Sequence, residues 1–331
     1  MTLALTEPHA LATRAITPLE RHPAAVYLAR LGSPRSRHVM RCALDSIARL
    51  LTDGRCDALS LDWAAVRYPH TTAIRARLAE RYAIATANQH LSALRGVLKE
   101  CWRLGFLEAA EYHRAVDVPA VRGSVLPRGR ALPARELRAV FGTCADDPSP
   151  LAVRDAAILG VLYGAGLRRA EAAALDRADL DAGSGSLRVL GKGNKQRMAY
   201  VRHGALAALE DWLALRGDAP GPLFWPVTKG GRLRARRLSA QAMLYVTRRR
   251  GQGAGVEHFS PHDLRRSFIS DLLDAGADLG TVQKLAGHAQ VQTTARYDRR
   301  GEHAKQQAAD LLHVPYASRR SAQSGGVVAH D

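Results

Sequence analysis

The feature of this chain that most limits its possible folds is an interruption of its helical pattern at residues 118–133, VPAVRGSVLPRGRALP. The prolines, glycines and arginines of this segment show little periodicity, which is typical of a connection between domains. A chain of 331 residues also has the length of two ordinary domains. The sequence therefore predicts two domains, joined by a linker at 118–133.

The part of the chain before this linker has a helical pattern over residues 21–117. Ser33 and Pro34 form a typical N-cap and first-turn pair, and apolar residues recur at helical spacing after them. A second amphipathic helix is expected over 86–107, with an apolar stripe formed by Leu91, Leu94, Val97, Leu98 and Trp102. We predict a small helical domain at 21–117, preceded by a loosely ordered arm at 1–20.

The part after the linker mixes helices with a short hairpin. Helices are expected over 135–141, 154–163 and 167–175. The runs SLRVL and QRMAYVR alternate apolar and polar residues and are joined through GKGNK, which predicts an antiparallel hairpin. The predicted fold is mainly α, with a small antiparallel β-sheet in a second domain at 134–315, and a disordered tail at 316–331.

The charge of the chain indicates a polyanionic partner. Its 48 Lys and Arg residues exceed its 31 Asp and Glu residues, which gives a formal net charge of +17. Such a surplus repels itself in the free protein, so nucleic acid is the natural partner. Polar and basic side chains on the predicted helices and in GGRLRARRLS are the candidate DNA contacts, which we expect to position the duplex rather than read its sequence: Arg37, Arg41, Asn88, Arg95, Lys99, Arg232 and Arg234.

Composition also argues against several other classes of protein. No stretch approaches the ~18 uncharged apolar residues that a membrane helix needs. The first residues lack the basic-then-apolar order of a secretion signal. The four cysteines are scattered without metal-ligand spacing, which favours a reduced, cytoplasmic protein without a structural metal.

Two short motifs of the second half place cations near turns. In GLRRAE, Arg168 and Glu171 share one face of the predicted helix, where the plainest interpretation is a surface ion pair. In GKGNK, Lys192 lies at the tip of the hairpin, where the plainest interpretation is exposure to solvent. Each motif is weak evidence when taken alone.

The segment SPHDLRRSF begins another predicted helix. Ser260 can act as the N-cap, Pro261 suits the first helical position, and Asp263 completes an approximate capping box. His262 and Arg265 then project from one face of the first turn. A helix N-terminus flanked by an imidazole and a guanidinium favours an anion such as phosphate.

The segment LAGHAQVQTTARYDR follows that helix. Gly287 is expected to end one helix as its C-cap, His288 comes next, and a new helix is expected to carry Tyr297. A tyrosine close to an apolar helix is by itself more typical of a core.

Taken together and in this order, these motifs resemble the tyrosine recombinase (phage integrase) family. The family signature has an Arg in G-L-R-x-x-E, a Lys on a β-hairpin, then H-x-x-R, G-H and a nucleophilic Tyr. The matching residues of this chain are Arg168, Lys192, His262, Arg265, His288 and Tyr297. The resemblance covers roughly residues 20–315 and implies a DNA clamp formed by a helical core-binding domain and a catalytic domain.

The resemblance implies a role for each of these side chains. Tyr297 would attack a DNA phosphodiester, forming a 3′-phosphotyrosyl bond and releasing a 5′-hydroxyl. Arg168 and Arg265 would bind the non-bridging oxygens, since a guanidinium fork suits phosphate. Lys192 would protonate the leaving oxygen. His262 is the candidate base, His288 a donor to the phosphate, and Glu171 and Asp263 are expected to orient the others.

Some alternatives stay open at this point. Lys195 is the rival general acid, and Tyr200 and Tyr316 are rival nucleophiles that do not follow G-H at the family spacing. A type IB topoisomerase-like enzyme would share the chemistry, and a non-catalytic DNA-binding regulator would share the charge.

The resemblance also implies a biological setting. The expected enzyme acts as a homotetramer on two specific duplex sites through a Holliday junction, without metal or other cofactor, in the cytoplasm at the nucleoid. It would serve a mobile element or replicon resolution, with DNA-bending helper proteins as further partners. A helix near 302–312 is expected to dock on a neighbouring protomer, the alternative being packing on its own domain.

Overall fold

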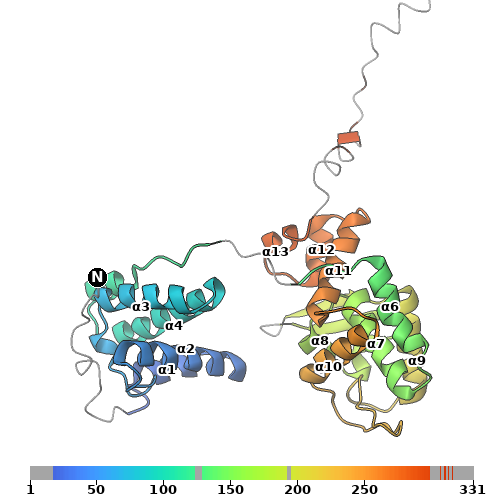
Figure 1. Cartoon of the computed structure of the whole chain (residues 1–331), viewed down its shortest axis with the longest axis horizontal. Helices are drawn as coiled ribbons and strands as arrows, with labels where there is room; N and C mark the ends of the chain where they lie inside the picture. Colours follow the sequence, from blue (N-terminus) through green and yellow to red (C-terminus); the bar gives the residue numbers. More distant parts are fainter. Residues whose placement is uncertain are drawn as a thin grey trace, which may run out of the picture. The chain divides into compact units, whose positions relative to one another are not determined.

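The computed structural model describes residues 18–123, 129–191 and 195–298, together with positions 306, 309, 310, 312 and 315. The chain divides into two compact units, residues 1–127 and residues 128–331 (Figure 1). This division lies within the Pro-, Gly- and Arg-rich segment 118–133. Each unit has a main hydrophobic core that consists only of its own residues.

Unit 1 is helical. Its central helix is α4, which packs against each of the other four α-helices. The predicted start of α2 is confirmed, because Ser33 Oγ accepts a 3.0 Å hydrogen bond from the Ser36 N–H and Pro34 is the first helical residue. The elements are α1 (Pro23–Ala29), α2 (Pro34–Thr52), the 3-10 helix η2 (Trp63–Ala65), α3 (Tyr68–Arg81), α4 (Ile84–Arg103) and α5 (Ala109–Val116).

The apolar stripe predicted for α4 is confirmed except at its end. Four of its members, Leu91, Leu94, Val97 and Leu98, are buried in the core of unit 1. Trp102, in the last turn of α4, is 39% exposed, and its ring stacks on Tyr112 of α5 with ring centroids 5.3 Å apart.

Unit 2 is built around α7, whose residues are buried on several sides. α7 packs against α6, α8, α9, α10 and α11, which explains why its sequence is apolar all round. The helices are α6 (Ala134–Ala145), α7 (Pro150–Gly164), α8 (Arg169–Ala174), the 3-10 helix η3 (Arg177–Asp179), α9 (His203–Arg216), α10 (Ala240–Gly253), α11 (Pro261–Asp274), α12 (Leu279–Ala286) and α13 (Val291–Ala295).

The described part of unit 2 contains one antiparallel sheet, in the order β1-β2-β3. β2 (Ser186–Leu190) and β3 (Gln196–Tyr200) form the predicted hairpin, with Val189 opposite Arg197. The sequence pattern missed β1 (Leu180–Asp181), because two residues are too few to show alternation. The predicted fold class, mainly α with a small antiparallel sheet in the second half, is confirmed.

Some predicted segments lie outside the described residues. These are residues 1–17 of the arm predicted at 1–20, the tail at 316–331, and most of the segment 302–312, for which a helix was expected. Among the helices that the structure describes, none is long and apolar enough to cross a membrane.

Candidate active site

A glycine turn between α7 and α8 positions Arg168. Gly166 has φ +59°, and a Cβ added to it would lie 2.2 Å from the Phe268 ring, so glycine is required there. Arg168 follows as the residue just before α8. Its backbone N–H donates to Glu171 Oε2 at 2.9 Å, and its guanidinium donates to Oε1 at 2.7 Å. The two residues therefore hold the start of α8 together rather than sharing a face within the helix.

Glu171 is buried between two arginines, contrary to the surface ion pair of the plainest interpretation. Only 6% of it is exposed. Arg197 of β3 binds the same carboxylate through two nitrogens, at 3.1 and 2.8 Å. Burial alone would raise the pKa of Glu171, but its hydrogen bonds with Arg197 and Arg168 and the charge of Arg197 together lower that pKa. Glu171 is thus a fixed anion that orients both guanidinium groups.

Sequence reasoning missed Arg197. A signal was present, because alternation along β3 places Arg197 and Ala199 on the inner face of the strand. A charged residue at an inward position of a strand requires a partner. Motif matching did not detect this, since Glu171 lies 26 residues earlier in the chain.

The predicted helix start at Pro261 is confirmed, with His262 and Arg265 in its first turns. His262 is exposed, whereas Arg265 is only 3% exposed. The predicted capping box is wrong. Ser260 Oγ donates to Asp263 Oδ2 at 2.6 Å instead of accepting from the helix backbone, and Asp263 Oδ1 accepts from the Arg130 N–H at 2.9 Å. Asp263 thus fastens the chain at Arg130 to the start of α11.

The last turn of α12 brings the arginines together. Three consecutive carbonyl oxygens each accept a hydrogen bond from a different guanidinium. Arg197 donates to Leu285 at 3.2 Å, Arg265 donates to Ala286, and Arg168 donates to Gly287 at 3.1 Å. The carbonyl end of a helix carries partial negative charge, which favours cations there. Arg265 also donates to the carbonyl of Gly166, which joins this turn to the glycine turn before α8.

Gly287 ends α12 in the left-handed conformation, with φ +64°, as predicted. His288 follows directly, and its Nδ1 lies 2.9 Å from Thr294 Oγ1. The imidazole stacks beside the Tyr297 ring at 6.1 Å between centroids and 21° between planes. The G-H motif thus lies next to the predicted nucleophile.

Tyr297 does not lie on a helix, which corrects the prediction. α13 ends at Ala295, and the Tyr297 N–H donates to the Thr294 carbonyl in the turn that follows. A β-branched pair, Thr293 and Thr294, disfavours longer helix continuation. The Arg266 guanidinium lies 5.0 Å from the centre of the Tyr297 ring, so a cation faces the phenol.

Electrostatics make this site a receptor for an anion. Burial, followed by the charges of Arg265 and Arg168, lowers the pKa of His288 to about 4. Although His262 is exposed, partial desolvation of its imidazole, followed by the charge of the neighbouring Arg266, lowers its pKa. Burial and Arg168 lower the pKa of Arg265 to about 10, which leaves it charged at neutral pH. Both imidazoles are therefore neutral at pH 7 beside fixed cations.

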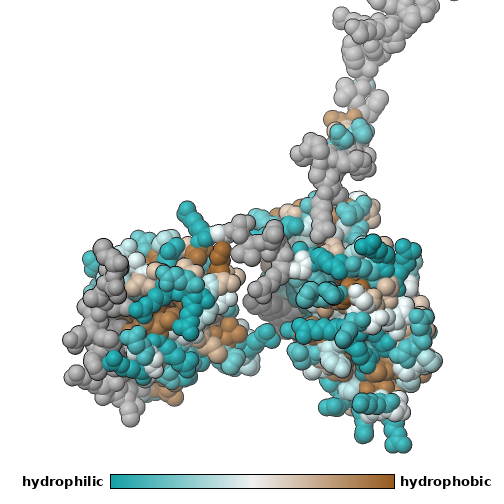
Figure 2. All heavy atoms as spheres, in the orientation of Figure 1, coloured by the Kyte–Doolittle hydropathy of each residue, from teal (hydrophilic) through white to brown (hydrophobic). Residues whose placement is uncertain are grey.

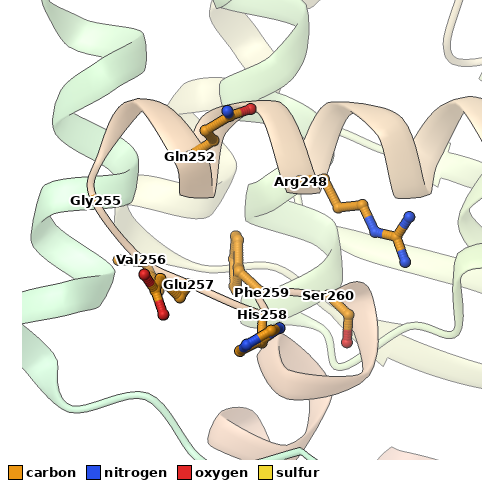
Figure 3. Close-up of a pocket in the computed structure, with 8 residues that line it drawn as sticks. All are labelled: Arg248, Gln252, Gly255, Val256, Glu257, His258, Phe259 and Ser260. Carbon is orange, nitrogen blue, oxygen red and sulfur yellow. The ribbon is translucent and has the colours of Figure 1, made fainter.

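The site opens to solvent through a hollow of about 300 Å³. Arg168, His262 and Arg265 line it together with Arg169, Leu244, Ser260 and Pro261. A larger hollow of about 760 Å³ shares Ser260 with it and lies along α10 and the segment that joins α10 to α11 (Figure 3). In that view Arg248 and Gln252 extend from α10, and Glu257 and His258 extend from the joining segment.

Only one of the two candidate lysines, Lys195, lies within the described residues. Lys192 lies outside the described residues. Lys195 is exposed, and its carbonyl accepts a 2.8 Å hydrogen bond from the Gly191 N–H. A Cβ added to Gly191 would lie 3.9 Å from Glu171 Oε1, so the described end of β2 lies beside the arginine cluster.

The rival nucleophiles lie elsewhere. Tyr200 is 44% exposed at the end of β3, and no hydrogen bond or ring contact in the described structure joins it to the arginine cluster. Tyr316 lies outside the described residues. Of these candidate nucleophiles, Tyr297 is therefore the one that the described structure places beside His288.

The candidate DNA contacts are of two kinds. Arg37, Lys99, Arg232 and Arg234 are exposed, and Figure 2 shows hydrophilic residues over much of the visible face. The other three are already bonded within unit 1. Arg41 pairs with Asp45 and Asp57, Asn88 exchanges two hydrogen bonds with the Val121 backbone, and Arg95 donates to the Val118 carbonyl. Asn88 and Arg95 therefore fix the segment that contains Val118 and Val121, which follows α5 at the end of unit 1.

Among the residues that the structure describes, no group of three or more His, Cys, Asp or Glu side chains could hold a metal ion. Among these described residues, Arg168, Arg197 and Arg265 are the cations gathered at the last turn of α12.

Residues 130–303 match the phage integrase family, and the chain belongs to that family. The tyrosine recombinase XerC of Myxococcus xanthus is 33% identical over 247 residues, which cover 71% of this chain and 78% of that protein. The tyrosine recombinase XerC of Chromohalobacter salexigens is 44% identical over 178 residues, 53% of this chain and 57% of that protein. The chain thus spans little more than half the length of this second relative.

Solved structures show the same fold. The Tn1549 transposon integrase in complex with a circular intermediate DNA aligns with a TM-score of 0.65 and 15% identity, over 90% of this chain and 100% of that one. The XerH site-specific recombinase bound to a palindromic difH substrate aligns with a TM-score of 0.63 and 20% identity, over 91% of each chain.

Proposed function

We propose that this protein is a site-specific DNA recombinase that cleaves and rejoins DNA through Tyr297. The observation that carries the proposal is the gathering of Arg168, Arg265, His288 and Tyr297 at the end of α12, with His262 lining one hollow together with the two arginines. Two forked cations, two neutral imidazoles and a phenol are the groups that an in-line attack on a phosphodiester requires.

In the proposed step the Tyr297 oxygen attacks phosphorus and loses its proton to His262. The bond from phosphorus to the 5′-oxygen breaks, and that oxygen takes a proton from Lys192. The products are a 3′-phosphotyrosyl ester and a free 5′-hydroxyl. Rejoining is the reverse attack by the 5′-hydroxyl of another strand, so the bond is conserved and no energy source is consumed.

The charges and contacts of the described residues support these roles. A phenol with a pKa near ~10 needs a base, and the lowered pKa of His262 keeps that imidazole neutral and able to accept a proton at pH 7. Arg168 and Arg265 are held by carbonyl oxygens before DNA arrives, so little reorganisation is needed. Thr294 engages Nδ1 of His288, which makes Nε2 the nitrogen to reach the phosphate.

Lys192 is our candidate for the general acid, with Lys195 as the alternative. Support comes from the described end of β2, where Gly191 lies near Glu171. Asp263 and Glu171 act by holding other groups of the site, because the oxygens of Asp263 are engaged by Ser260 and Arg130 and those of Glu171 by Arg168 and Arg197.

The proposed partners are duplex DNA with specific recombination sites and three further copies of this chain. The net charge of +17 supports duplex DNA, a polyanion, as the partner. We further propose strand exchange through a Holliday junction, the C-terminal segment 302–312 docking on a neighbouring protomer, and helper proteins that bend the DNA. The setting is the cytoplasmic nucleoid, in the service of a mobile element or of replicon resolution.

The first test uses labelled, nicked duplexes from the DNA that flanks the gene, incubated with protein in the presence of a metal chelator. The wild type is expected to form a protein–DNA adduct that resists SDS, and Tyr297→Phe is expected to bind the DNA without forming it. Tyr200→Phe is the matched control, because its tyrosine is exposed on β3.

An adduct that survives Tyr297→Phe would refute the assigned nucleophile, and its loss in Tyr200→Phe would favour the rival. If the wild type and both variants bind the DNA and none of the three forms an adduct, a DNA-binding regulator would be favoured. Relaxation of a supercoiled plasmid that lacks a second site would favour the topoisomerase-like alternative.

A further inference from the structure

Thr294 of α13 contacts both His288 and the backbone of Tyr297. Its Oγ1 lies 2.9 Å from Nδ1 of His288, and its carbonyl accepts a 2.9 Å hydrogen bond from the Tyr297 N–H. The residue is fully buried. One threonine therefore joins the histidine of the G-H motif to the turn that carries the proposed nucleophile.

The direction of the hydrogen bond to His288 follows from the burial of the hydroxyl. Within the described residues the Thr294 hydroxyl has a single hydrogen-bond partner, Nδ1 of His288. The buried hydroxyls of Thr52 and Thr247 donate instead to the carbonyl four residues earlier in their helices. A buried hydroxyl needs an acceptor for its hydrogen. The Thr294 hydroxyl therefore donates to Nδ1, since the opposite direction would bury its hydrogen without an acceptor.

This direction decides which nitrogen of His288 can act as a donor. Burial and the charges of Arg265 and Arg168 keep the imidazole neutral at pH 7. A neutral imidazole carries its hydrogen on one nitrogen only. Because Nδ1 accepts from Thr294, the hydrogen lies on Nε2. The other tautomer would present a lone pair on Nε2, which repels an anion.

The backbone of His288 is held independently of the Thr294 hydroxyl. Its N–H donates to the Gln283 carbonyl at 3.1 Å, and its own carbonyl accepts from Nε2 of Gln283 at 3.1 Å. The Tyr297 ring stacks beside the imidazole. Loss of the hydroxyl alone should therefore change the tautomer of His288 without displacing the residue.

We propose that Thr294 is a positioning residue that sets the tautomer of His288, so that Nε2–H is the group donated to the phosphate beside Tyr297. This inference rests on the proposed function. Thr294 acts through the imidazole and makes no contact with DNA in this role. A purely structural threonine would instead stabilise the turn before Tyr297 and leave the tautomer unchanged.

The tautomer is measured first, in the free protein at pH 7. Protein labelled with ¹⁵N-histidine is studied by long-range ¹H–¹⁵N correlation NMR, which separates a ring nitrogen that bears a hydrogen from one that does not. The signals of His288 are identified by their loss in His288→Ala. The wild type and Thr294→Ser, which keeps a hydroxyl, should show the hydrogen on Nε2. In Thr294→Val the two nitrogen signals should move toward each other, because the two tautomers mix.

The matched control is Thr293→Val. Thr293 lies next to Thr294 in α13, is only partly buried, and its hydroxyl makes no hydrogen bond in the described structure. This variant should keep the wild-type tautomer. The signals of the other histidines report whether each variant is folded, and the tautomer of the wild type tests the inference even where Thr294→Val does not fold.

The second measurement is the rate of adduct formation on the nicked duplex. Thr294→Val should slow it by about 10- to 10²-fold, less than the ~10²–10³-fold that follows loss of a whole donor, which is the effect expected of His288→Ala. Thr294→Ser and Thr293→Val should stay within about threefold of the wild type. In the His288→Ala background, Thr294→Val should change the rate by no more than about twofold, because the group through which it acts is gone.

A wild type with the hydrogen on Nδ1 would overturn the proposal, and so would an unchanged tautomer in Thr294→Val. Equal slowing by Thr294→Val in the presence and absence of His288 would overturn it as well, since the threonine would then act through the turn. If the wild type shows the expected tautomer but forms no adduct, the proposed function fails. The hydrogen bond then stands, while its role in the reaction falls with that function.

Discussion

At the scale of single residues, the surrounding charges decide which ionic form each side chain takes. His288 lies near Arg265, Arg168 and Arg197, and burial together with these cations keeps its imidazole neutral. Glu171 experiences the opposite effect and remains ionised although it is buried. The same arginines thus favour a neutral imidazole and a charged carboxylate within one site, which is the state that an incoming phosphate requires.

His288 predicts a specific dependence of stability on pH. Its pKa is about 4 in the folded chain and about 6.5 when unfolded. Between these values the unfolded chain binds the extra proton, so the stabilisation present above pH 6.5 is lost as pH falls toward 4. The wild type should lose roughly 2 kcal/mol more than His288→Gln over this range, after allowance for partial solvent exposure.

Urea unfolding of both proteins at pH 7 and pH 4.5 measures this difference. His262 and the other histidines are common to both proteins and cancel in the comparison. Parallel loss of stability in the two proteins would show that His288 is not held neutral by its surroundings.

At the scale of elements, a buried carboxylate fastens α10 to α7. Asp155 is fully buried and accepts hydrogen bonds from Arg154 of its own helix and from Arg249 and Arg250 of α10. Leu244 on the same α10 lines the hollow of the site. The position of one wall of the site therefore depends on an ion cluster at the far side of α10.

Replacement of Asp155 by Asn should destabilise unit 2 by about 3–5 kcal/mol, because it leaves buried guanidinium groups without their counter-charge. Asp211→Asn on the exposed face of α9 is the control, with an expected change within about 0.5 kcal/mol. Urea unfolding followed by circular dichroism compares the three proteins. Equal stability of Asp155→Asn and wild type would mean that the cluster contributes little net free energy.

At the scale of the whole molecule, two features act together: a separate main hydrophobic core in each unit and a large positive charge. Both units contain more basic than acidic residues. A protein that grips DNA through such a surplus releases condensed counterions when it binds. For duplexes that lack a recombination site, affinity should therefore depend strongly on salt concentration and less on base sequence.

With about six phosphate contacts, the logarithm of the binding constant should fall with the logarithm of salt concentration at a slope near −5. Arg37→Gln and Arg232→Gln replace exposed arginines, and each should make the slope shallower by about 1. Fluorescence anisotropy between 50 and 200 mM salt measures it. A slope near zero would show that the positive charge serves something other than phosphate contact.

Much of this protein could be predicted from local sequence. The caps at Ser33 and Gly287, the hairpin and the helix start at Pro261 each depend on neighbours a few residues away, and the structure confirms them. The differences at Ser260 and Trp102 also have local positions, but they involve partners that are distant in the sequence. Asp263 accepts the hydrogen bond of the Ser260 hydroxyl and also binds Arg130, and the Trp102 ring stacks on Tyr112 of another helix.

The sequence by itself determined the helical class, the hairpin and the ordered set of side chains able to act on a phosphodiester. Only the tertiary structure decided how those side chains meet: that Glu171 is buried between Arg168 and Arg197, and that the last turn of α12 collects three arginines. The physical reason is the range of the forces involved. Caps and turns are decided within a few residues, whereas a buried charge is stable only where packing brings distant partners to it.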